Sequence, residues 1–81
     1  MKKSIHSSEQ AKLQSLLREI RKEAGLRQVE LAKKLGKPQS FVSKYESGER
    51  RLDLIELHKI CKATNFSLVD LAKRFESLLV V

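Results

Sequence analysis

The chain has 81 residues, 41% of them hydrophobic, which is enough for one small domain with its own core and leaves no room for a second. A single cysteine and two histidines exclude an internal disulfide and a zinc site with the usual ligand spacing. The net charge of +7 is uneven, because residues 1–51 carry 13 Lys and Arg against 6 Asp and Glu, whereas residues 52–81 carry 4 against 4. This basic first part favours nucleic acid as a partner, although ribosomal contact, acidic lipid or solubility alone also fits the charge.

Nothing in the sequence predicts secretion or a membrane span. The two lysines near the start are not followed by an apolar run, and the longest run of large apolar residues is only 78–81. We therefore expect a cytoplasmic protein without membrane contact. Three glycines, one proline and many helix-forming residues favour an all-α fold of five helices, preceded by a frayed tail over residues 1–7.

The first two helices are predicted from their apolar spacing and their ends. Apolar residues at intervals of three and four predict a helix over 8–24, with Ser7 at its start and Gly25 after its end. A shorter helix should lie between Arg27 and Gly36. Arg27 stands where Ser or Thr would accept a hydrogen bond, so we expect this start to be weaker by about 1 kcal/mol.

Three further helices follow. Pro38 should be the first helical residue of the third, because proline loses no hydrogen bond there. The fourth should start at Asp53, with Glu56 completing a capping box, and its apolar side should include Leu54, Leu57, Ile60 and Cys61. A fifth helix should run from Ser67 to Leu79 after a stop at Asn65.

The third helix carries an unusual polar face. At about 100° per residue, Phe41, Val42 and Tyr45 share one side of it. The opposite side, which has no acidic residue, holds Gln39, Ser40, Ser43, Lys44 and Ser47. These side chains suit the edges of DNA bases, and short serines allow a close approach to the groove. An ordinary solvated helix face is the alternative explanation.

Three neighbouring features favour DNA reading over a plain solvated face. The preceding helix is short and joined through Gly36, as in a helix-turn-helix motif. Gly48, Arg50 and Arg51 lie just beyond the polar helix, where backbone amides and guanidinium groups can hold phosphates. The positive charge is also concentrated in this part of the chain. Phe41 borders the polar face, and its role is open between core packing and contact with a thymine methyl.

Residues Leu16 to Leu79 resemble the Cro and phage-repressor type of helix-turn-helix, the XRE family. The positions that carry the resemblance are Gln28, Ala32, Gly36, Val42 and Tyr45. It implies a five-helix λ-repressor-like domain over residues 8–81, with the helix-turn-helix at 28–47, that binds double-stranded DNA. Arg27 departs from the Thr or Ser usual in the family, which adds a candidate phosphate contact.

The resemblance also implies roles for single residues. Gln28 would bind a phosphate and brace Gln39, while Gln39, Ser40 and Lys44 would read bases with Ser43 and Ser47 beside them. Arg21 and Glu46 would form an internal ion pair that positions the third helix; a solvated pair worth about 0 to 1 kcal/mol is the alternative. The expected phosphate contacts are Arg21, Arg27, Gln28, Lys37, Gly48, Arg50 and Arg51.

The expected function is a repressor-like transcriptional regulator that binds an inverted-repeat operator as a homodimer, because one reading helix buries too little surface for tight binding. The dimer contact is expected on the uncharged second part of the chain, at Phe75, Leu78, Leu79, Val80 and Val81. An antitoxin or a coactivator-like adaptor on the same scaffold is the alternative, and RNA binding is disfavoured by the scarcity of exposed aromatics.

No enzymatic activity is expected. The serines have no base in a hydrolase pattern, no glycine-rich phosphate loop is present, and nothing indicates a cofactor, a metal or a small-molecule effector. Cys61 is expected to be a buried thiol without a redox role, and His58 a surface or partly buried histidine.

Overall fold

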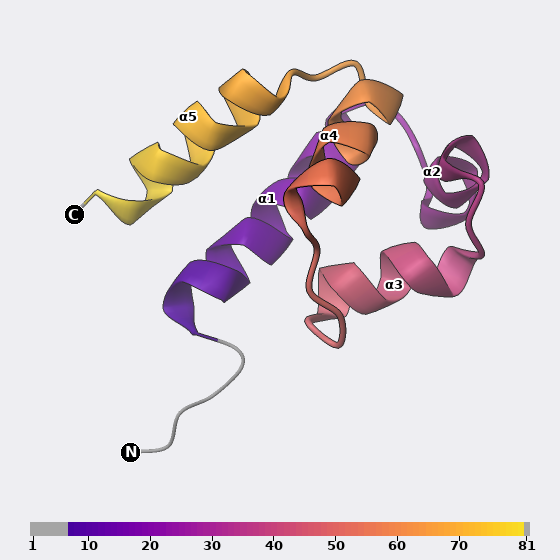
Figure 1. Ribbon diagram of the computed structural model, residues 1–81, viewed down its shortest axis with the longest axis horizontal. Helices are drawn as coiled ribbons and strands as arrows, with labels where there is room; N and C mark the ends of the chain where they lie inside the picture. The colour runs from indigo at the N-terminus through magenta and orange to yellow at the C-terminus, as the bar shows by residue number, and fades with distance from the viewer. Residues whose placement is uncertain (1–6, 81) are drawn as a thin grey trace.

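The computed structural model describes residues 7–80, which form five α-helices and no strand (Figure 1). The helices are α1 (Ser8–Glu23), α2 (Gln28–Leu35), α3 (Gln39–Ser47), α4 (Leu54–Ala63) and α5 (Leu68–Leu79). The all-α fold of five helices is therefore confirmed. The expected tail, apart from Ser7, and Val81 lie outside the described residues.

The helices form two groups around α1. Helix α5 runs back along α1 in the opposite direction, and α4 lies in front of α1 (Figure 1). Helices α2 and α3 form the corner of the molecule away from the chain ends, with α2 at the right of Figure 1 and α3 below it. None of the helices between residues 7 and 80 is both long and apolar enough to cross a lipid bilayer.

Each helix contributes to one core in the middle of this arrangement. The residues with at most 3% exposure are Leu16, Leu17, Ile20, Leu31, Ala32, Val42, Tyr45, Ile60, Cys61 and Leu71. Cys61 is thus buried as expected, and His58 is exposed. Leu54 lies on the apolar side of α4 with Leu57, but the groove between α1, α4 and α5 stays open beside it and leaves it 66% exposed.

The helix ends follow the sequence pattern with small corrections. Asp53 accepts a hydrogen bond from the Glu56 amide at 2.8 Å while Glu56 accepts one from the Asp53 amide at 2.9 Å, which completes the expected capping box. The Arg27 side chain accepts no hydrogen bond from the α2 amides, as expected, although Glu30 accepts one from the Arg27 amide at 2.8 Å. Pro38 precedes α3 instead of starting it, since its ψ of 158° is extended and its carbonyl accepts from the Phe41 amide.

Helix α5 is attached differently from the others. Leu71 is its one buried residue, whereas four residues of α1 are buried. Exposed ion pairs connect it to α1, since Arg74 lies 3.4 Å from the Glu19 carboxylate and 3.2 Å from the Glu23 carboxylate. The Arg74 guanidinium also lies over the Phe66 ring. Such exposed pairs contribute about 0 to 1 kcal/mol each, so α5 is held mainly by the half-buried side chains along its inner face.

Candidate nucleic-acid interface

The polar side of α3 faces away from the protein. The residues expected to read bases are all exposed, namely Gln39, Ser40, Ser43, Lys44 and Ser47. Glu46, the acidic residue of α3, is turned inward and is 2% exposed. The outer face of α3 therefore presents amide, hydroxyl and ammonium groups that can pair with base edges, and no carboxylate that would repel nearby phosphates.

The inner side of α3 packs against α2 through small and aromatic residues. Val42 and Tyr45 are at most 1% exposed, and Ala32 on α2 allows the two helices to pack closely. Phe41 contacts the Tyr45 ring edge-on, with centroids 5.5 Å apart, which favours the core-packing role over a contact with thymine. At the turn, Gly36 has a φ of 70°, which favours glycine, and an added Cβ would meet no atom within 4 Å. Glycine is therefore required for its backbone conformation and not for lack of space.

A chain of side-chain hydrogen bonds connects the start of α3 to α1. Gln39 donates to Gln28 Oε1 at 3.4 Å, and Gln28 donates to Glu46 Oε1 at 3.0 Å. Glu46 also accepts from Arg21 Nε at 2.7 Å and from Arg21 Nη2 at 3.0 Å. The chain holds the Gln39 side chain at the entrance of the polar face before any DNA is present.

Arg21 and Glu46 form a buried ion pair and not a solvated one. Their residues are 8% and 2% exposed, and the third Arg21 donor, Nη1, is bonded to the Leu26 carbonyl at 2.9 Å. The hydrogen bond to Glu46 raises the pKa of the Arg21 guanidinium. Because the residue is also buried, Arg21 has little guanidinium surface left for a phosphate, unlike the half-buried Gln28.

The turn after α3 also differs from the expectation. Gly48, with a φ of 90°, donates its amide to the Lys44 carbonyl, and the amides of Glu49 and Arg50 donate to the same oxygen at 2.9 and 3.2 Å. The Gly48 residue is buried. These amides cap the end of α3, so the expected phosphate contact at Gly48 is not supported. The Ser47 hydroxyl likewise donates to the Lys44 carbonyl, at 3.1 Å.

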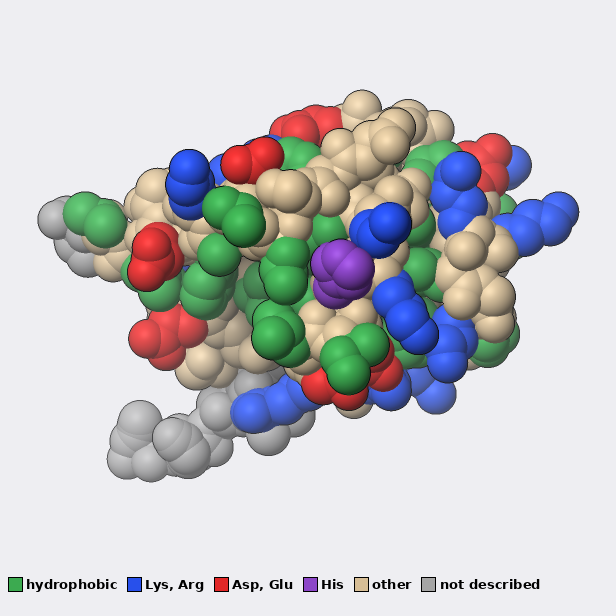
Figure 2. Space-filling view, turned by 45° about the horizontal axis from the view of Figure 1, so that its top comes forward, with side chains coloured by type: hydrophobic (Ala, Val, Ile, Leu, Met, Phe, Trp, Pro, Cys, Tyr) green, Lys and Arg blue, Asp and Glu red, His purple; other side chains and the backbone are tan. Residues whose placement is uncertain are grey.

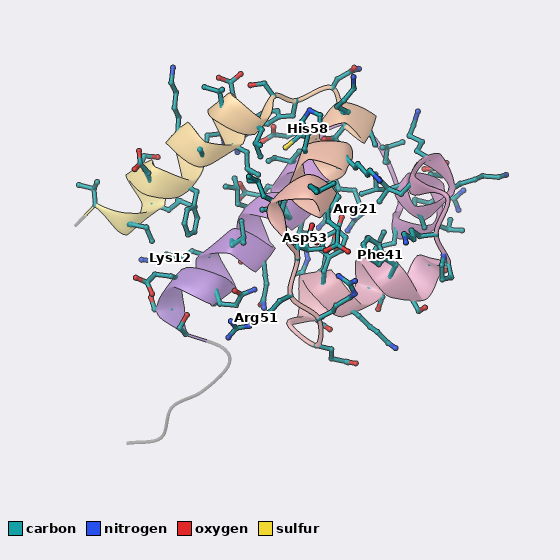
Figure 3. The ribbon with its side chains drawn as sticks, viewed as in Figure 1. Lys12, Arg21, Phe41, Arg51, Asp53 and His58 are labelled. Atoms are coloured by element: carbon teal, nitrogen blue, oxygen red, sulfur yellow. The ribbon has the colours of Figure 1, made fainter. Side chains whose placement is uncertain are left out.

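The remaining candidate phosphate contacts differ in whether the side chain is exposed or is already hydrogen-bonded within the protein. Arg27, Lys37 and Arg51 are exposed, although Arg27 also lies 3.2 Å from the Glu30 carboxylate. In Figure 3 Arg51 points away from Phe41 and from the space between α3 and α4. Arg50 is different, because its guanidinium is bonded to Glu56 within the protein.

Arg18 is a candidate that the sequence reading missed. Its guanidinium lies 3.5 Å from the Glu46 carbonyl and 3.7 Å from the Glu46 carboxylate, and its side chain is 49% exposed. It therefore places positive charge beside the C-terminal end of α3. The available signal was its position three residues before Arg21, which puts both arginines on one side of α1.

One of the residues expected at a dimer contact lines an apolar groove of about 200 Å³ between α1, α4 and α5, whereas Leu78 lines a separate hollow between α1 and α5. Phe75 lines the groove and is half-buried, as is Leu79, whereas Leu78 and Val80 are 43% and 78% exposed. Apolar side chains gather on this face beside His58, shown in purple in Figure 2. Val81 lies outside the described residues. The remaining groove residues are Leu13, Leu54, Leu57, Leu68, Leu71 and Ala72.

Comparisons with known proteins agree with this geometry. Residues 17–71 match a family model described as helix-turn-helix. The chain is 44% identical to an XRE-family like protein from Pseudomonas syringae pv. tomato, with 91% of this chain and 90% of the other covered and a TM-score of 0.83. It is 27% identical to a crystallised mutant of the restriction-modification controller protein C.Esp1396I, with 90% and 92% covered and a TM-score of 0.81. No curated protein sequence matches it. The chain therefore belongs to the XRE family of helix-turn-helix, DNA-binding transcription regulators.

Proposed function

We propose that this protein binds an inverted-repeat operator as a symmetric homodimer, places α3 of each subunit in the major groove, and represses transcription there. The observation that carries the proposal is the exposed, carboxylate-free face of α3, which the bonded chain from Gln39 to Arg21 holds in place. A controller protein among the similar structures supports a regulatory role.

Base reading and phosphate contact are assigned to different residues. Gln39, Ser40, Ser43, Lys44 and Ser47 face the base edges, where glutamine pairs with adenine and lysine with guanine. Around them Arg18, Arg27, Gln28, Lys37 and Arg51 contact phosphates. Phosphate contacts fix the protein's position on the duplex without reading its sequence.

The dimer surface is assigned to the apolar groove and its rim. A free monomer would leave Leu54 66% exposed there, in the same groove as the half-buried Phe75. A second copy would cover these side chains, and two copies present two reading helices at half-sites about 34–36 Å apart. All groove residues except Leu13 lie on the part of the chain whose charges balance, which lowers the repulsion between two basic proteins at this surface.

Sedimentation tests the dimer with two matched variants of α4. Leu54→Asp should halve the mass at micromolar concentration, because it places a charge on the groove. Ile55→Asp is the control, since Ile55 is equally exposed at 67% but borders Phe41 on the other side of α4. Dissociation by Ile55→Asp alone would move the interface to that side.

Selection of bound duplexes from a randomised pool at physiological salt tests operator reading. We expect an inverted repeat with half-sites about one helical turn apart. Gln39→Ala and Lys44→Ala should each weaken binding to the selected site by about 1–3 kcal/mol and relax the base preference. Lys62→Ala, which removes the same charge from an exposed position on α4, is the control. Equal losses on every sequence would contradict base reading by α3.

A further inference from the structure

Arg50 is the most highly connected side chain of the segment between α3 and α4. Its Nη1 donates to Glu56 Oε1 at 3.1 Å and to the Arg51 carbonyl at 2.8 Å, and its Nη2 donates to Glu56 Oε2 at 2.9 Å. The guanidinium carbon also lies 4.8 Å from the centre of the Phe41 ring. A bidentate pair combined with stacking on an aromatic ring fixes the plane of the guanidinium.

The partners of Arg50 belong to the two helices that the segment joins. Phe41 lies on α3, on the side that faces the start of α4, where Figure 3 also labels Asp53. Glu56 lies in the first turn of α4 and accepts the Asp53 amide of the capping box. Arg50 therefore links the reading helix directly to the beginning of α4. We call the three side chains Phe41, Arg50 and Glu56 the clamp.

Within the clamp the positive charge of Arg50 is already paired, whereas a phosphate contact would need it unpaired. Three hydrogen bonds of the guanidinium are made inside the protein, and a carboxylate at 2.9 Å balances its charge. The Arg50 side chain is 41% exposed and that of Glu56 is 24% exposed. A phosphate that approached Arg50 would meet the Glu56 carboxylate as well, which weakens its attraction.

We propose that Arg50 is a positioning residue that fixes the angle between the reading helix and the start of α4, and so determines which spacing of half-sites the dimer accepts. The inference rests on the proposed function. Leu54, on the proposed dimer surface, follows Asp53 directly. Each clamp therefore connects one reading helix to the dimer contact, and two clamps set the separation and tilt of the two helices on DNA.

The test compares Arg50→Lys with Arg51→Gln in the full-length protein. Affinities are measured against salt concentration on the selected operator and on operators with one base pair added or removed between the half-sites. Arg50→Lys keeps the charge but loses the fork that binds Glu56. We expect the salt slope, which is the slope of log affinity against log salt concentration, to stay unchanged. The ratio of affinities for the selected and altered spacings, which measures discrimination, should fall roughly threefold or more. Arg51→Gln should reduce the slope by about 0.9 and keep the discrimination.

Glu56→Gln checks the same clamp from α4. It should reduce the discrimination as Arg50→Lys does, and the double variant should lose little more, because both changes break one interaction. Thermal unfolding confirms that each variant is folded.

Three outcomes would contradict the inference. Discrimination like that of the wild type in Arg50→Lys and Glu56→Gln would show that the clamp does not set the spacing. Arg50→Gln, measured in the same way, removes the charge as well as the fork; a reduced salt slope in this variant, with discrimination intact, would return Arg50 to the phosphate contacts. A wild-type protein that selects no operator would refute the proposed function itself, and the inference with it.

Discussion

Removal of Glu46 should be the most destabilising single change in the interface. Glu46→Leu leaves the Arg21 guanidinium, in a residue only 8% exposed, without the carboxylate that now accepts two of its hydrogen bonds. Breaking a buried pair in this way costs about 3–5 kcal/mol. The total stability of a domain of this size is about 4–12 kcal/mol, at roughly 0.05–0.15 kcal/mol per residue. The loss is therefore a large share of the total.

The double variant Arg21→Met with Glu46→Leu tests whether the cost comes from leaving the Arg21 charge buried without a partner, or from losing the Arg21–Glu46 interaction itself. Two apolar residues of similar volume often replace a buried pair at no cost. The Leu26 carbonyl would still lose the donor that now lies 2.9 Å away, which leaves a penalty of about 1 kcal/mol. The double variant should thus be more stable than Glu46→Leu by about 2–4 kcal/mol.

Thermal unfolding followed by circular dichroism measures both effects. In a domain of this size about 1 kcal/mol corresponds to a shift of 4–8 °C in Tm. We expect Glu46→Leu to lower Tm by at least about 12 °C and the double variant to recover most of that loss. A Glu46→Leu protein within about 1 kcal/mol of the wild type would show that water reaches the pair. Equal stability of the single and double variants would show that the unpaired charge is not the cause.

Three further predictions concern α4. Asp53→Ala removes the acceptor of the Glu56 amide and should cost about 1 kcal/mol in urea unfolding; an unchanged midpoint would contradict the cap. The hydrogen bonds from Arg50 and from the Asp53 amide lower the pKa of Glu56, so its stabilising contribution is present above the usual carboxyl pKa and is lost as pH falls through the lowered value. Glu56→Gln should therefore make the free energy of unfolding depend less on pH at acid pH. A pH dependence equal to that of the wild type would refute this. Burial raises the pKa of the Cys61 thiol, so a thiol reagent should modify it only as fast as the protein unfolds, and rapid labelling of the native protein would contradict its burial.

The helices were predictable because their signals are local. Apolar residues at intervals of three and four placed α1, and the pairs Asp53 with Glu56 and Ser67 with Asp70 marked the starts of α4 and α5. The polar face of α3 followed from the same periodicity, since Val42 and Tyr45 identify its inner side. Each of these inferences needs only residues within about two turns of one another.

The partners of polar groups were harder to predict because they depend on the conformation of the turns and on how the helices pack, which helical periodicity does not give. Arg50 was expected at a phosphate, but its partner Glu56 is placed by the turn before α4 and not by helical spacing. Gly48 was assigned to a phosphate although its amide caps α3. Leu54 matched the apolar stripe of α4, yet among residues 7–80 no other helix covers the end of the groove beside it. Sequence periodicity predicts which side of a helix is apolar, but not whether another element covers it.

The weak attachment of α5 links the folding of this helix to the amount of protein present. With only Leu71 buried and exposed ion pairs to α1, α5 should open at a lower free energy than α1 in a single subunit. A second subunit that covers the groove would supply the apolar contacts that α5 lacks within its own chain. Ordering of α5 and pairing of subunits would then occur together, so at low concentration the amount of dimer competent to bind an operator would rise with about the square of the total protein concentration.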